Sequence, residues 1–160
     1  MRWWLVGLTA ALLGAGCSTQ GASNTGNTGT LSPVQSATVG AIKWLQSHKP
    51  ALEALQTDLN KVTDSGNASN LPGVVTGCQN LKTDTTADLA LAPIPDAQIQ
   101  GHWSASLADF QSGATDCISG IQESDLGLEA QYKAQIASGI SQSNTLVKEF
   151  NALVAQATTP

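Results

Sequence analysis

Positive charge is scarce in this sequence. Its 160 residues include seven Lys and Arg against twelve Asp and Glu, and Arg2 is the single arginine. The net charge of −5 argues against nucleic-acid binding, because neutralising phosphates requires a basic face. The same charge disfavours contact between the protein surface and anionic lipid headgroups. Two classes of partner, nucleic acids and bare membrane surfaces, are therefore not expected.

The motifs of common active sites are also missing. The sequence has no Gly-x-Ser-x-Gly turn and no glycine-rich phosphate loop. Neither His48 nor His102 follows a Glu by three residues, as a di-iron bundle requires, and there is no Cys-x-x-Cys-His motif for haem attachment. Four aspartates at helical spacings are predicted to be solvated surface charges: Asp84, Asp88, Asp109 and Asp116. We expect no enzymatic activity, no catalytic residue, no metal site and no cofactor.

The first sixteen residues have the pattern of a secretory signal peptide. Arg2 gives a positive start, an apolar stretch from 5 to 13 follows, and small residues lead to Cys17. This apolar stretch is nine residues long, whereas a membrane-spanning helix needs roughly 20. We predict that residues 1–16 are removed on export.

The end of this segment, Leu13-Gly14-Ala15-Gly16-Cys17, resembles the lipobox of bacterial lipoproteins. Gly14 departs from the larger apolar residue usual at its place. The resemblance implies that Cys17 receives a diacylglyceryl group and becomes the mature N-terminus. Two acyl chains suffice for stable anchoring. The alternatives are an ordinary secreted protein cut at Ala15 or Gly16, and an uncleaved anchor.

Residues 17–31 are predicted to be the lipidated cysteine and a flexible, disordered tether. Ser, Thr, Asn and Gly dominate the stretch, whose sequence after Cys17 is STQGASNTGNTGTL. Such a composition buries too little apolar surface to offset the entropy of ordering. Its root-mean-square reach is about 20 Å.

With Cys17 assigned to lipid, Cys78 and Cys117 remain of the three cysteines. An exported chain meets an oxidising compartment, where two such cysteines pair as a disulfide. A loop of this length implies a stabilisation of about 4 kcal/mol in the chain-entropy view. Metal ligation is the rival use, and it is weakly supported because no histidine lies nearby in the sequence.

The remaining residues, 32–157, are predicted to form one all-α domain. Ser32-Pro33-Val34-Gln35 has the pattern of a capping box, and apolar or small residues then recur at three- and four-residue spacing: Ala41, Leu45, His48, Leu52, Leu55, Leu59 and Val62. Because Pro50 interrupts this stripe, we expect either a helix over 33–64 kinked near Pro50 or two segments meeting near Lys49. Gly66 or Asn67 is expected to supply a left-handed cap.

Three further amphipathic helices are predicted. The second follows Pro72 and ends at Ala92-Pro93-Ile94-Pro95, the third starts at Asp96, and the fourth follows a break at Ser124-Asp125. Their stripes are Val74 or Val75, Cys78, Leu81, Thr85 and Leu89, then Ile99, Trp103, Leu107 with Ser106, Phe110, Ala114, Cys117 and Ile121, then Leu128, Tyr132, Ile136, Ile140, Ser143, Val147, Phe150 and Val154. No segment alternates like a strand. The pattern favours an up-down-up-down four-helix bundle.

Glycine is unusually common within these predicted helices. Gly73-x-x-x-Gly77 has the spacing of a close-packing motif, and five more glycines interrupt the stripes: Gly40, Gly101, Gly113, Gly120 and Gly139. Each costs about 1 kcal/mol relative to alanine. Either the helices approach closely at these positions, or the sequence is loosely optimised.

The segment Pro93-Ile94-Pro95-Asp96, followed by Trp103 and Cys117, resembles a pattern in uncharacterised exported proteins of actinobacteria. The resemblance covers about residues 74 to 150. It implies no activity, but it agrees with an envelope location and with pairing of Cys78 and Cys117.

These observations indicate a cell-envelope lipoprotein on the extracytoplasmic face of the cell membrane. Its domain is predicted to be a non-enzymatic binding module for an envelope protein or a small ligand. Trp44, at the edge of the first stripe, is the candidate interface residue if it is half-exposed. The alternative for Trp44 is a ring packed under neighbouring side chains. The alternative function is a carrier or sensor that holds an apolar molecule between helices, or a haem clamped by His48 and His102. We expect His48 to be partly buried and hydrogen-bonded, and His102 to lie at the surface.

Overall fold

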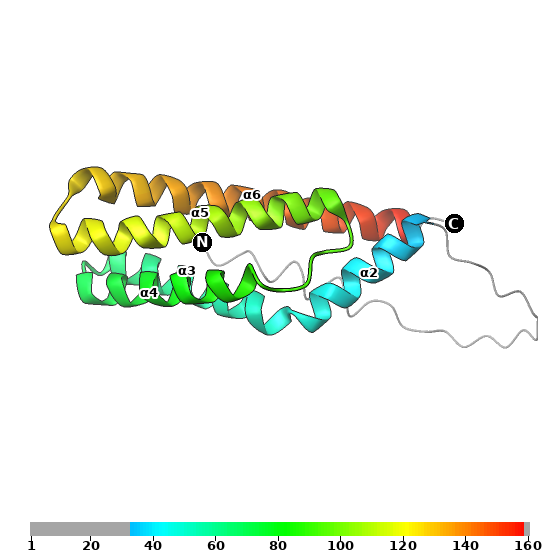
Figure 1. Cartoon of the computed structure of the whole chain (residues 1–160), viewed down its shortest axis with the longest axis horizontal. Coiled ribbons are helices and arrows are strands. Elements are labelled where there is room, and N and C mark those ends of the chain that lie inside the picture. The colour runs from blue at the N-terminus through cyan, green and yellow to red at the C-terminus, as the bar shows by residue number, and fades with distance from the viewer. Residues whose placement is uncertain (1–32, 159–160) are drawn as a thin grey trace, which may run out of the picture. The chain divides into compact units, whose positions relative to one another are not determined.

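A computed structural model describes residues 33–158, which form five helices and no strand (Figure 1). The helices are α2 (Pro33–Ser47), α3 (Lys49–Asn67), α4 (Leu71–Asp88), α5 (Ala97–Glu123) and α6 (Leu126–Thr158). The predicted all-α class is confirmed. The predictions for residues 1–16, Cys17 and the tether lie outside the described residues. Within them, no helix combines the length and the apolar character needed to cross a bilayer.

The predicted first helix is two helices that meet at His48. The backbone of His48 (φ −108°, ψ 9°) departs from helical geometry, and Pro50 lies in the first turn of α3. Proline is tolerated there because the amides of a first turn have no partner within the helix. Of the two expected forms, a kinked helix and two segments, the structure has the second.

The ends of α3 and α5 are closed by left-handed serines rather than by glycine. Ser69 and Ser124 have φ values of 54° and 56°, so the expectation of a left-handed Gly66 or Asn67 is wrong. In each turn, the amide of the residue after the serine donates to a carbonyl in the last turn of the helix. Asn70 N–H donates to the Ser65 carbonyl at 2.8 Å, and Asp125 N–H donates to the Gly120 carbonyl at 2.9 Å. This is the Schellman pattern, which occupies the terminal carbonyls.

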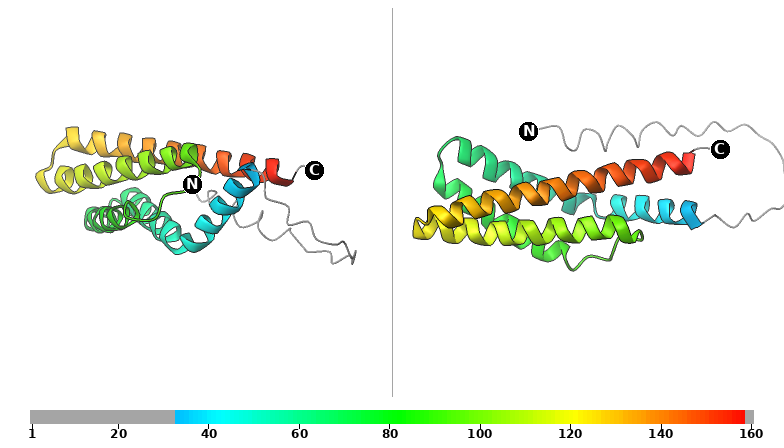
Figure 2. Two further views of the ribbon diagram at one scale, coloured as in Figure 1. Left: turned by 45° about the vertical axis from the view of Figure 1, so that its right-hand side comes forward. Right: turned by 90° about the horizontal axis from the view of Figure 1, so that it is seen from above.

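The residues after these serines start the next helices. The Asn70 side chain accepts from Gly73 N–H at 3.2 Å, and the Asp125 side chain accepts from Gly127 N–H at 2.8 Å. In each turn the left-handed serine therefore ends one helix, and the residue after it caps the next. The result is two helical hairpins with tight turns. Both turns lie at the same end of the domain, opposite the start of α2 (Figure 2).

The connection between α4 and α5 is longer and runs lengthwise before the chain turns back (Figure 1). Prolines 93 and 95 keep it extended, and Ile94 is buried within it. Asp96 then caps α5, accepting from the amides of Gln98 and Ile99 at 3.0 Å each. The predicted role of Asp96 at this helix start is confirmed.

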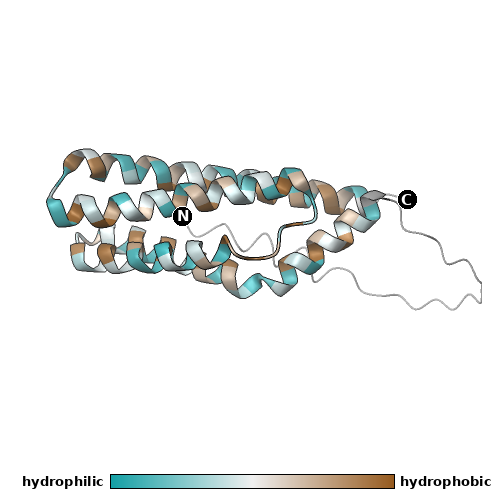
Figure 3. Cartoon of the chain, viewed as in Figure 1, coloured by the Kyte–Doolittle hydropathy of each residue, from teal (hydrophilic) through white to brown (hydrophobic). Residues whose placement is uncertain are grey.

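The buried side chains form two clusters. The larger one joins all five helices and the α4–α5 connection: Ala41, Trp44, Leu55, Leu81, Ile94, Ile99, Trp103, Leu107, Phe110, Ala114, Leu146 and Phe150. The smaller one lies around the cysteines: Val62, Val74, Cys78, Cys117 and Tyr132. Helix α5 packs along α6 and against α4, α4 packs on α3, and α2 contacts α6. Each helix carries both hydrophobic and hydrophilic positions along its length (Figure 3), as expected of helices with one buried face.

Several glycines lie where helices approach closely. A methyl group on Gly139 of α6 would come within 2.6 Å of the Phe110 ring of α5. One on Gly77 of α4 would lie 2.8 Å from the Val62 side chain of α3. Gly101 instead faces open space. Close approach therefore explains some of the helical glycines, and Gly101 is not among them.

Replacing Gly139 and Gly101 by alanine should have opposite effects. Gly139→Ala is expected to lower the free energy of unfolding by about 1–3 kcal/mol, because the buried Phe110 ring cannot move away without disturbing its neighbours. Gly101→Ala, the matched control, should raise it by about 0.5–1 kcal/mol through helix propensity alone. Urea denaturation of both variants measures the difference. Equal stabilisation by both would mean that the glycines result from loose optimisation.

Candidate functional site

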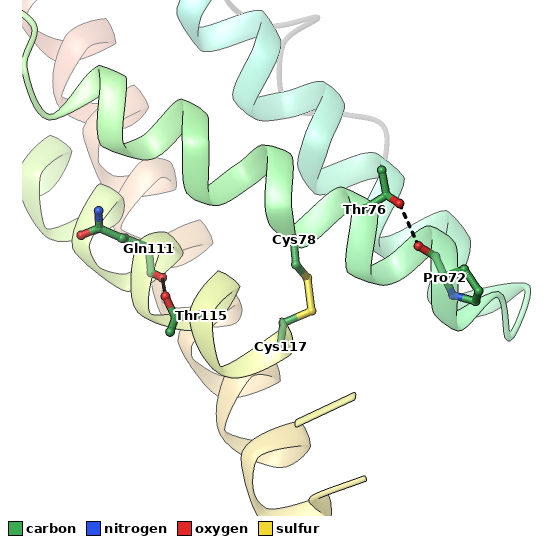
Figure 4. The surroundings of a disulfide bond; sticks show 6 residues. All are labelled: Pro72, Thr76, Cys78, Gln111, Thr115 and Cys117. Atoms are coloured by element: carbon green, nitrogen blue, oxygen red, sulfur yellow. Dashed lines mark hydrogen bonds between the residues drawn. A yellow bond between two sulfur atoms is a disulfide. The ribbon is translucent and has the colours of Figure 1, made fainter. Parts of the chain in front are cut away.

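The two cysteines of the domain meet between α4 and α5. Cys78 Sγ and Cys117 Sγ lie 1.99 Å apart, and the Cα atoms are separated by 6.4 Å (Figure 4). Both side chains are fully buried. On either side, the hydroxyls of Thr76 and Thr115 donate to backbone carbonyls one turn back. The predicted pairing is thus present in the structure.

The register of this bond depends on the α4–α5 connection. Cys78 lies ten residues before α4 ends, whereas Cys117 lies twenty residues after α5 begins. Ten helical residues correspond to about 15 Å. The lengthwise run of the connection covers this difference, since it carries the chain past the end of α4 before α5 starts.

Trp44 is a buried core residue, so the structure has the packed alternative and not the half-exposed side chain of the interface candidate. Only 6% of the residue is exposed. Its ring stacks on His48 at 4.5 Å, meets Trp103 edge-on at 5.6 Å, and its Nε1–H donates to the Ala92 carbonyl. The side chain therefore fastens α2 to α5 and to the α4–α5 connection, and leaves little surface for a partner.

The two histidines are held by neighbouring groups. His48 Nδ1 lies 2.8 Å from the Trp44 carbonyl, and the residue is half-buried as predicted. His102 Nδ1 lies 2.7 Å from Gln142 Oε1, and its Nε2 lies 3.4 Å from Glu149 Oε1. His102 is thus half-buried between α5 and α6, not a surface residue as expected. In the described part of the chain, no three His, Cys, Asp or Glu side chains are grouped closely enough to hold a metal ion.

Aspartates on the facing sides of α3 and α4 are the unexpected feature of the domain. Asp58 and Asp88 are each only 5% exposed, and Oδ2 of each has no hydrogen-bond partner. Asp84, one turn before Asp88, is half-buried. The prediction that Asp84 and Asp88 are solvated is therefore wrong, because both lie on the side of α4 that packs against the rest of the domain. Asp109 and Asp116 are also half-buried, and Asp109 accepts from Ser138.

Burial changes the acidity of these groups. Loss of hydration raises the pKa of Asp58 from 3.8 to about 6, and the nearby Asp84 charge adds to the rise. The pKa of Asp88 is likewise raised to about 6, first by burial and then by Asp84, while His48 acts in the opposite direction. Both groups therefore change charge in the mildly acidic range, where an exposed aspartate is already ionised.

The sequence carried a signal for these buried aspartates. Asp58 falls three residues after Leu55 and four before Val62, both of which are buried. Asp88 continues the spacing of Leu81 and Thr85 in the same way. The signal was missed because a charged residue within a stripe is usually at its exposed edge. Leu89, expected on the stripe, is instead 46% exposed.

Two large apolar side chains are exposed directly after the hairpin turns. Leu71 is 58% exposed and Leu126 is 78% exposed, the largest such values among the described hydrophobic residues. Each is the first residue of its helix, after the left-handed serine and the capping residue. We call the end of the domain that carries both turns the hairpin end. It lies opposite the first turn of α2 (Figure 2).

Comparisons with known proteins yielded no relative. No family model matches the chain, and searches of curated proteins and of solved structures gave no match.

Proposed function

We propose that this protein is a lipoprotein of the bacterial cell envelope whose helical domain is a non-enzymatic interaction module. Residues 1–16 direct export, Cys17 carries the lipid, and residues 17–31 link it to α2. The Cys78–Cys117 bond supports an oxidising, extracytoplasmic location, since structural disulfides are rare in the cytoplasm. In this proposal, α3 to α6 act as an up-down-up-down four-helix bundle and α2 closes one end of it.

The exposed leucines of the hairpin end carry the proposal of an interaction role. In the sequence, residues 17–31 precede α2, and the hairpin end lies opposite the first turn of that helix (Figure 2). Leu71 and Leu126 occupy that end with more than half of their surface in solvent. Exposed leucines at a rigid turn are suited to insertion into an apolar pocket of another envelope protein.

The alternative function, a carrier of an apolar molecule or haem, is less favoured by the packing. The space between the helices is occupied by buried rings, those of Trp44, Trp103 and Phe110. Both histidines already contact neighbouring polar groups, so a haem clamp would have to break those contacts. We therefore favour recognition at the surface over binding in the core.

Site-specific photo-crosslinking in the native host tests the interaction module. A benzophenone amino acid at position 71 or 126 is expected to give one adduct of the same mass. Position 101, which is exposed and lies in the first turns of α5 away from the hairpin end, is the matched control and should give none. Leu71→Asn combined with Leu126→Asn should weaken capture by a crosslinker at Asp125 without changing the unfolding transition. Equal adducts from position 101, or none from the hairpin end, would refute the proposal.

A further inference from the structure

Between α3 and α4, the carboxyl group of Asp84 neighbours those of both Asp58 and Asp88, with few compensating charges. Asp58 projects from α3, and Asp84 and Asp88 come from α4. Asp58 and Asp88 each keep one buried oxygen that receives no hydrogen bond. A buried anion without a donor is unfavourable, and the usual remedy is a proton, a cation or a paired base.

The charged groups around this cluster do not balance it. On α3, Lys61 is the nearby base for Asp58, and at the α2–α3 junction His48 acts on Asp88. Asn80 of α4 is a neutral neighbour of Asp58 and partly offsets the rise in the pKa of that carboxyl. From α5, the residue bonded to this part of α4 is the neutral Gln111, whose amide donates to Thr86. Lys61 is exposed, so its charge is largely screened by water.

The contact between Asp58 and Asp84 indicates how a proton would stabilise these carboxyl groups. The two carboxyl groups lie within hydrogen-bonding reach of each other. Two ionised carboxylates only accept hydrogen bonds, so they can bond to each other only when one of them carries a proton. A single proton from solvent therefore converts a repulsive contact between α3 and α4 into a hydrogen bond.

We propose that Asp58, Asp84 and Asp88 form a proton-operated latch, which holds α3 on α4 in mildly acidic surroundings and loosens that contact at neutral pH. In the closed form, Asp58 is protonated and donates a hydrogen bond to Asp84, and Asp88 is protonated as well. In the open form, both protons have returned to solvent, and the charge of Asp84 repels the charges of Asp58 and Asp88.

The loosening is confined to one half of the α3–α4 pair. Near the hairpin turn, Gly77 packs closely against Val62, and Cys78 joins α4 to α5. The latch lies at the other end of α4, next to His48 and the α2–α3 junction. Opening therefore affects the middle of α3 and the last turn of α4, while the disulfide end stays closed.

The sign of the pH effect follows from the raised pKa values. Asp58 and Asp88 hold their protons more tightly in the folded chain, at about 6 against an ordinary 3.8. The stability they contribute is full below the unfolded pKa and is lost as the pH rises through about 6. A chain whose carboxylates are paired in the usual way would lose stability in the opposite direction, as the pH falls.

Thermal unfolding at about pH 5 and about pH 7.5 tests the latch in the full chain. We expect the midpoint of the wild type to fall by several degrees between the two. Asp58→Asn and Asp88→Asn, which keep the shape and remove the charge, should raise the midpoint at the higher pH and reduce the fall. The matched control is Asp64→Asn, on the exposed side of α3, which should keep the wild-type fall.

Direct titration keeps the proposal testable if a variant fails to fold. Carboxyl carbon chemical shifts of the wild-type protein should show Asp58 and Asp88 titrating near pH 6. Titration of Asp58 and Asp88 near pH 4, or a wild-type midpoint that does not fall toward neutral pH, would overturn the latch. A calcium effect would also overturn the latch. If calcium raises the unfolding midpoint at neutral pH and Asp58→Asn abolishes that rise, the cluster binds a metal ion rather than a proton.

Discussion

Replacing both Cys78 and Cys117 by alanine is expected to lower the free energy of unfolding by about 4 kcal/mol. The bond closes a loop with a sequence separation of 39, and opening it restores the entropy of that loop to the unfolded chain. Both sulfurs are fully buried between α4 and α5, so the lost contacts add to the effect. Guanidinium denaturation with fluorescence detection measures the change.

The single variants distinguish a covalent bond from simple packing. Cys78→Ala and Cys117→Ala each break the same bond, so each alone should cost nearly as much as the double change. Wild-type protein unfolded in strong reductant should match the variants. Two outcomes would show that the bond does not stabilise the domain: losses of unfolding free energy in the single variants that sum to the loss in the double variant, or a double variant within about 1 kcal/mol of the wild type.

Trp44→Ala should cost about 3–5 kcal/mol, the range for deleting a large buried ring. The ring contacts Trp103, stacks on His48 and donates to the Ala92 carbonyl, so its loss separates α2 from the α4–α5 connection. Trp44→Phe is the matched control. It keeps most of the packing and loses mainly the hydrogen bond, worth about 1 kcal/mol.

Urea denaturation of these two variants decides whether Trp44 belongs to the core. A loss below about 1 kcal/mol for Trp44→Ala is what an exposed interface residue would give, and it would contradict the packing described above. Hydrogen exchange should locate the damage in α2 and the first turns of α5, with the disulfide end of α4 unaffected.

Local sequence rules predicted the helices well, because each rule concerns neighbouring residues. Asp96 at a helix start and the break near Lys49 follow from capping and from the geometry of proline, and both are present. The left-handed serines were missed because glycine and asparagine occur nearby and usually take that role. Ser69 is left-handed because α3 continues through Gly66 to Asn67.

The features that sequence rules did not predict depend on contacts between distant segments. The burial of Trp44 depends on the α4–α5 connection, about fifty residues later in the chain. The burial of Asp58 and Asp88 depends on how α3 and α4 face each other, which a stripe on one helix does not specify. The Cys78–Cys117 pairing was predictable because it follows from an expected oxidising compartment and from the two cysteines that remain after Cys17.

The export and anchoring of this chain are tested most directly by mass spectrometry of its N-terminal peptide, isolated from the native host. We expect a peptide that begins at Cys17, carries a diacylglyceryl thioether and lacks residues 1–16. A peptide that retains Met1, or one in which Cys17 is unmodified, would contradict it.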